Sequence, residues 1–164
     1  MNDANDHIDN FMKENKVYIT ERDTLIEKVK EKYPNEKLFY TYVPYNGFYF
    51  YRRQTMAMIK DVAVIVEESS AKSLAEFRER NKEVIDKLKD TDLFPQELQI
   101  EIDIMRDDAA DISNFENIRR CVVYPENIGT MIDDGSIPSG FATSLIGNIF
   151  EVSGWGKHTE IKEI

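Results

Sequence analysis

The sequence is poor in the residues on which cross-linking, metal binding and nucleophilic catalysis most often depend. Its 164 residues include one cysteine and two histidines, so a disulfide within the chain is excluded and the single thiol fits a reducing cytosol. No run of about 18 apolar residues is present, and we therefore expect no transmembrane helix. The first residues, MNDANDHID, are acidic and lack the apolar stretch of a secretory signal.

Charge is what the chain has in excess. It carries 31 acidic and 21 basic residues, a formal net charge of −10, and its 41% apolar content is typical of one folded, charge-rich domain. The acid is concentrated in residues 61–116, where 16 acidic and 7 basic side chains give −9. Such a surface repels phosphate backbones and anionic lipid, so we expect neither nucleic acid nor membrane as a partner. It is either the solvated side of helices, or a surface that keeps an aggregation-prone protein soluble or meets a basic partner.

No group of residues has the composition of a catalytic or metal site. The chain has no glycine-rich phosphate loop. His7 and His158 lie near the chain ends, so neither is placed to activate Cys121, which we expect in the core of an apolar helical stretch. The pairs Asp107-Asp108 and Asp133-Asp134 lack the alternating ligand spacing of a calcium loop. We predict no catalytic, cofactor-binding or metal-binding residue, and hence a protein that is not an enzyme.

The N-terminal segment is predicted to form two short helices on either side of a β-prone run. Residues 5–15 carry apolar side chains at helical spacing, and Lys16–Ile19 favours a strand. Thr20 resembles the N-cap of a second helix, which Pro34 would end. We divide the chain into an N-terminal helical segment (residues 1–35), a body (residues 36–156) and a C-terminal tail (residues 157–164).

The strongest local signal is a β-hairpin in the stretch LFYTYVPYNGFYFYRR, residues 38–53. Two β-prone runs flank Asn46-Gly47, a dipeptide that favours a two-residue type I′ turn. With this loop, Tyr45 lies opposite Phe48 and Val43 opposite Phe50. One face then carries Phe39, Val43, Tyr45, Phe48 and Phe50, and the other carries Leu38, Tyr40, Tyr42, Tyr49 and Tyr51.

The tyrosine face of the predicted hairpin is the main candidate for partner binding. A two-stranded ribbon is marginal alone and needs something packed on it, so we expect the phenylalanine face to cover the helices. The tyrosine face is then either covered by the N-terminal segment or left for a partner, because tyrosine is enriched where proteins meet. The candidate partner-binding residues are Tyr40, Tyr42, Tyr49, Tyr51 and Trp155.

From Gln54 onward the chain is predicted to be helical. Residues 56–66 are apolar on nearly every side, which is typical of a buried central helix, and Ser69-Ser70 is a candidate break. Further helices are expected over residues 74–88, from Pro95, and from Phe115 to Pro125. The helix after Pro95 has an apolar seam that should pack on another helix: Leu98, Ile102, Met105, Ala109 and Ile112. The predicted fold class is α+β and mostly α-helical, with a small antiparallel β-hairpin packed on a helical bundle.

A closing helix is predicted after Pro138, which suits a helix start because it has no N–H to leave unpaired. Its apolar stripe consists of Phe141, Leu145, Ile149 and Val152. Gly154 can adopt the left-handed conformation that ends helices. Trp155 follows and is either a core or helix-capping aromatic folded onto the stripe, or an anchor of an interface.

Several of these pieces together resemble a known family. They are Cys121–Pro125 (CVVYP), Asp133-Asp134, Pro138–Gly140 (PSG), Ser153–Trp155 (SGW), and the aromatic-arginine run Phe48–Arg53 that leads into the helical body. In this order the pattern resembles tail assembly chaperones of contractile- and long-tailed phages, over roughly residues 38–156.

The resemblance implies a non-enzymatic role in virion morphogenesis. Members of this family act in the host cytoplasm, bind the tape measure protein during tail assembly, and are absent from the finished virion; self-association is also plausible for them. The alternative is a small structural virion protein of the phage baseplate or neck, whose sequence would look much the same.

Overall fold

The computed structural model describes residues 3–43 and 46–155, with side chains described from Asn15 onward except that of Ser139. Helices make up 68% of it beside one small antiparallel sheet, which confirms the predicted mostly helical α+β class. No helix in these ranges is both long and apolar enough to cross a membrane. In chain order the elements are α1 Asp3–Lys32, β1 Leu38–Val43, β2 Gly47–Arg52, α2 Met56–Arg80, α3 Lys82–Lys87, α4 Gln96–Cys121, β3 Val122–Tyr124, α5 Ile128–Asp133 and α6 Ser139–Val152.

The N-terminal segment is one continuous helix, so the predicted β-prone break at Lys16–Ile19 is wrong. Tyr18 continues the apolar stripe of Leu25, Ile26 and Val29 at helical spacing, and this stripe packs on the sheet. Thr20 is no N-cap: its hydroxyl donates to the carbonyl of Lys16, one turn back, at 2.8 Å. Packing along the whole helix therefore overrides the strand preference of four residues. The predicted end before Pro34 is confirmed.

The hairpin exists, but its predicted register is wrong. Val43 pairs with Gly47 and Tyr42 with Phe48, so three residues, not two, separate the paired ends. Gly47 has a φ of +91°, and the amide of Asn46 donates to the carbonyl of Val43 at 3.0 Å. A glycine at positive φ after a three-residue loop is another common way to close a hairpin. The pairing predicted for Tyr45 lies outside the described residues.

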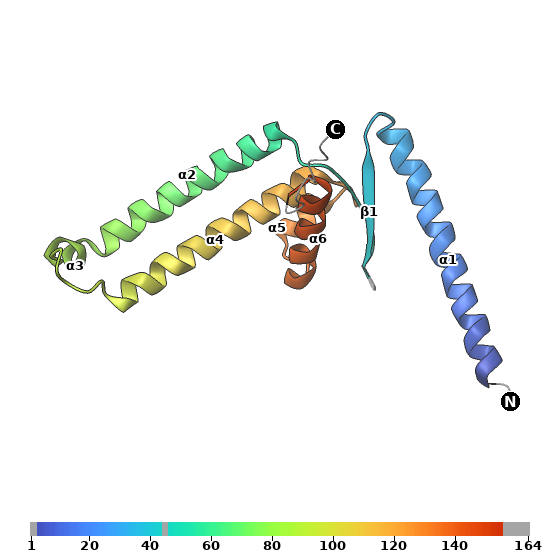
Figure 1. Ribbon diagram of the computed structural model, residues 1–164, viewed down its shortest axis with the longest axis horizontal. Coiled ribbons are helices and arrows are strands. Elements are labelled where there is room, and N and C mark those ends of the chain that lie inside the picture. Colours follow the sequence, from blue (N-terminus) through green and yellow to red (C-terminus); the bar gives the residue numbers. More distant parts are fainter. Residues whose placement is uncertain (1–2, 44–45, 156–164) are drawn as a thin grey trace, which may run out of the picture.

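A third strand that the sequence did not predict completes the sheet. The expected helix from Phe115 to Pro125 is instead the last part of α4, which ends at Cys121. The chain then extends as β3 and pairs antiparallel with β2, giving the order β1-β2-β3. The sheet separates two cores: α1 covers one face, while α4, α5 and α6 cover the other. Figure 1 shows this arrangement, with β1 between α1 and the other helices.

Helices α2 and α4 pair as a long antiparallel arm that reaches away from the sheet, with α3 near its tip (Figure 1). The expected break at Ser69-Ser70 does not occur; α2 ends at Arg80, and Asn81 separates it from α3. Helix α4 packs on α2, and every residue of its predicted seam is buried or half-buried. The prediction that α2 is a buried central helix is wrong, because only Val62 and Phe77 are buried along its length.

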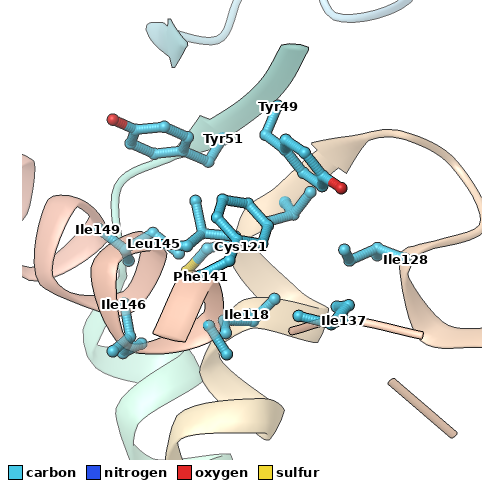
Figure 2. Packing of buried hydrophobic residues seen from close by; sticks show 12 residues of the cluster. Tyr49, Tyr51, Ile118, Cys121, Ile128, Ile137, Phe141, Leu145, Ile146 and Ile149 are labelled. Carbon is cyan, nitrogen blue, oxygen red and sulfur yellow. The ribbon is translucent and has the colours of Figure 1, made fainter. Parts of the chain in front are cut away.

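The main core lies where α6 crosses the root of α4 beneath the sheet. Leu145 and Ile149 of α6 have no exposed surface, and Phe141 is also buried, which confirms the predicted stripe. Ile118 and Cys121 of α4 face them, and β2 contributes Tyr49 and Tyr51 from above (Figure 2). The closing helix is therefore the central element of the body.

Candidate partner-binding surface

The four tyrosines predicted to share one face lie on two different faces. The observed pairing is shifted by three residues from the predicted one. Because side chains alternate between the two faces of a strand, an odd shift places each face of β1 beside the other face of β2. Tyr49 and Tyr51 lie with Phe39 and Val43 on the face toward α6. Tyr40 and Tyr42 lie with Phe48 and Phe50 on the face toward α1. The predicted continuous tyrosine face does not exist.

Tyr49 and Tyr51 are part of the main core. Both are buried, and the ring of Tyr49 packs on Phe141 with ring centroids 4.5 Å apart. Burial raises the pKa of both phenols above the ordinary value, because the charged form would lose its hydration. Neither side chain offers a surface to a partner in this conformation.

Tyr40 and Tyr42 are half-covered at the outer edge of the sheet. Their exposed fractions are 41% and 44%. Tyr18 of α1 packs edge-on against Tyr42, with a centroid distance of 4.8 Å, and also contacts Phe48. Helix α1 therefore covers most of this face, and the two tyrosines form its rim.

Trp155 stands just after α6 in a complete helix-ending motif. Gly154 has a φ of +92°, its amide donates to the carbonyl of Glu151 at 3.1 Å, and the amide of Trp155 donates to the carbonyl of Phe150 at 2.9 Å. These are the two hydrogen bonds of a Schellman ending, and the Trp155 ring also contacts Phe150. The ring therefore folds back onto Phe150 rather than onto the predicted stripe, and 56% of the surface of Trp155 stays exposed.

An open groove of about 490 Å³ lies beside Trp155, at the root of the arm. Its lining is mostly apolar: Ile59, Val62, Ala63 and Val66 of α2, with Phe150 and Trp155 from the α6 side. Glu67, Gln54, Ser113 and Asn117 add polar atoms. The sequence did not reveal this groove. Its one signal is the apolar character of residues 56–66 on nearly every side, a pattern that is also typical of burial in a core.

The side-chain amides of Gln54 and Asn117 are hydrogen-bonded within the groove. Trp155 donates its indole N–H to the side-chain oxygen of Gln54 at 3.0 Å. Gln54 donates in turn to the side-chain oxygen of Asn117, and Asn117 donates to the carbonyl of Ser113 at 2.8 Å. The backbone amide of Gln54 donates to Ser153. Asn117 is buried, so this chain of bonds holds the start of α2, the root of α4 and the end of α6 together.

Chemistry-bearing side chains do not converge elsewhere in the described ranges. Cys121 is buried, as predicted, and burial raises the pKa of its thiol to about 11, so it is neutral at physiological pH. Among the residues the structure describes, no three histidine, cysteine or acidic side chains gather to hold a metal ion. The side chain of His7 and all of His158 lie outside those residues.

The arm exposes further apolar side chains toward its tip. Leu93 is 94% exposed, and several others are open to solvent: Leu74, Val84, Phe94, Ile100 and Ile104. These residues share the segment of net charge −9. The arm therefore exposes large apolar side chains within an acidic segment.

In comparisons with protein-family models, curated proteins and solved structures, the chain matches none.

Proposed function

We propose that this chain is a phage tail assembly chaperone, which binds the tape measure protein in the host cytoplasm during tail morphogenesis and has no enzymatic activity. The motifs between Phe48 and Trp155 resemble that family. Tape measure proteins carry long apolar helical stretches that would aggregate if left exposed, and an acidic protein with an open apolar surface is suited to hold them in solution.

The observation that carries the proposal is the groove at the root of the arm. Its walls are mostly apolar, it is open to solvent, and the side-chain amides of Gln54 and Asn117 are already hydrogen-bonded. Such a surface offers burial of apolar side chains rather than chemistry on a substrate.

Co-expression with the tape measure protein of the same phage tests the proposal. We expect the tape measure protein to be soluble and to co-purify with this chain, and to be insoluble when expressed alone. A tape measure protein that stays insoluble with this chain present would contradict the proposal.

Mass spectrometry of purified virions distinguishes a chaperone from the alternative, a small structural protein of the baseplate or neck. A chaperone is absent from the particle or present only in traces. A constant number of copies per virion would establish the structural role instead.

A further inference from the structure

The groove at the root of the arm has a shape and charge that fit one kind of partner. We propose that it binds a single amphipathic α-helix whose apolar stripe is flanked by lysine and arginine. The inference rests on the proposed function for its choice of a helical protein partner, and it specifies where that partner binds and what its sequence must contain.

The apolar wall of the groove follows one face of α2. Ile59, Val62, Ala63 and Val66 span two turns, about 10 Å at 1.5 Å per residue. Ala63 is exposed and lines the groove among these larger apolar residues. A linear apolar strip of this length is matched by side chains at positions i, i+3 or i+4, and i+7 of a facing helix.

The polar atoms of the groove do not require a polar ligand. Gln54 and Asn117 pair with Trp155, Ser113 and each other, and no described side chain has a buried polar atom without a hydrogen bond. A small polar ligand would have to break these bonds to gain its own. An apolar side chain that covers them leaves these bonds intact, so it avoids most of this cost.

The charge around the groove selects a basic partner. Glu67 lines the groove, and the arm that continues from it belongs to the segment of net charge −9. Of the 16 acidic side chains in residues 61–116, few form ion pairs in the described structure: Asp86, Glu101, Asp103 and Glu116. Basic residues beside an apolar stripe would meet these carboxylates, whereas a second copy of this acidic chain would be repelled.

The position of Trp155 provides a direct measurement. It is the chain's one tryptophan, and it lines the groove. A synthetic 18-residue helix without tryptophan, with leucines at i, i+3, i+4 and i+7 and lysines beside them, should change the fluorescence of Trp155 in a saturable titration at low salt. A peptide with glutamate in place of lysine should bind at least about tenfold more weakly, and salt should weaken the lysine peptide.

Two pairs of variants separate the groove from the rest of the arm. Ala63→Arg places a long, positively charged side chain in the groove and should weaken binding of the lysine peptide at least about tenfold. Its control, Ala75→Arg, makes the same charge change at an exposed position of α2 outside the groove and should stay within about twofold. Likewise Glu67→Lys should weaken binding more than Glu68→Lys, an exposed neighbour that does not line the groove. Because all four positions are exposed, thermal melts should show unchanged folding.

Each outcome decides the inference. Equal binding of the glutamate peptide, or equal effects of Ala63→Arg and Ala75→Arg, would overturn it. So would a concentration-dependent dimer, seen by sedimentation, that Ala63→Arg abolishes, because the occupant would then be a second copy. If the tape measure protein co-purifies equally well with the Ala63→Arg variant, the proposed function is supported but this groove is not its binding site. If the lysine peptide binds specifically in the groove but no complex with the tape measure protein forms, the binding site is supported and the proposed function is contradicted.

Discussion

Leu145 shows most clearly what a single residue contributes to this fold. It has no exposed surface and lies on α6 in the middle of the main core (Figure 2). Leu145→Ala should lower the free energy of unfolding by about 2–5 kcal/mol, because it removes buried methyl groups and leaves a cavity. Denaturant melts measure this. Leu93→Ala, at a residue 94% exposed, is the control and should change the stability by at most about 0.5 kcal/mol. A Leu145 variant as stable as that control would place α6 outside the cooperative core.

Tyr42 and Tyr49 should respond very differently to the same substitution. Tyr49→Ser removes a buried ring from the main core and should cost about 3 kcal/mol or more. Tyr42→Ser removes a half-exposed ring that contacts Tyr18 and Phe48, and should cost at most about 1.5 kcal/mol. Melting curves of the two single variants test this. Equal losses would mean that the two tyrosines share one environment, as the two-residue loop predicted.

At the scale of elements, the sequence predicted which segments form structure better than how they pair. The hairpin at residues 38–53 and α6 were both predictable, because turn residues and helical spacing are local signals. The register was not, since Asn46-Gly47 suits either a two-residue or a three-residue loop. The length of the loop decides whether Tyr49 or Phe48 faces α6. That length is determined by packing against the rest of the chain and not by the local sequence.

Local sequence patterns could not predict strand β3 or the exposure of α2 either, because both depend on contacts with the rest of the chain. Val122–Tyr124 is too short to be distinguished from the end of a helix, and it becomes a strand only because β2 has a free edge beside it. An apolar helix such as α2 is either buried or open to a partner, and its own sequence is the same in both cases. The groove beside Trp155 depends on this distinction and on Asn117, a buried polar residue that the apolar pattern hid.

The regular geometry of α6 and the motif that ends it can be tested by the same substitution, glycine to alanine, at two positions. Gly154 has a φ of +92°, so Gly154→Ala should destabilise the protein by about 1–2 kcal/mol. Gly147 lies exposed inside α6, where an added Cβ meets nothing within 4 Å, so Gly147→Ala should stabilise it by up to about 1 kcal/mol. Thermal melts of the two variants measure both changes in stability. A loss of stability at Gly147 would show that this helix does not have the regular conformation described.

At the scale of the whole molecule, stability is concentrated at one end. The main core joins β2, α4, α5 and α6, and α1 covers the opposite face of the sheet with a second, smaller core. Along the arm between residues 67 and 110, only Phe77 and Leu98 are buried. The arm is therefore held by a thin seam, while its acidic side chains add repulsion rather than support.

This distribution predicts that the arm opens before the rest of the protein does. Backbone amides of α2 and α4 near the tip should exchange with deuterium at least about tenfold faster than those around Ile118 and Leu145, because local opening there exposes little buried apolar surface. Hydrogen-exchange mass spectrometry of the intact chain measures this. Phe77→Ala should speed exchange throughout the outer arm and leave the protection of α6 unchanged. Its effect on global melting should also be smaller than that of Leu145→Ala, since an arm that is already open when the core unfolds no longer contributes to the transition. If Phe77→Ala instead deprotects α6 to the same extent as the arm, the whole molecule unfolds as one unit.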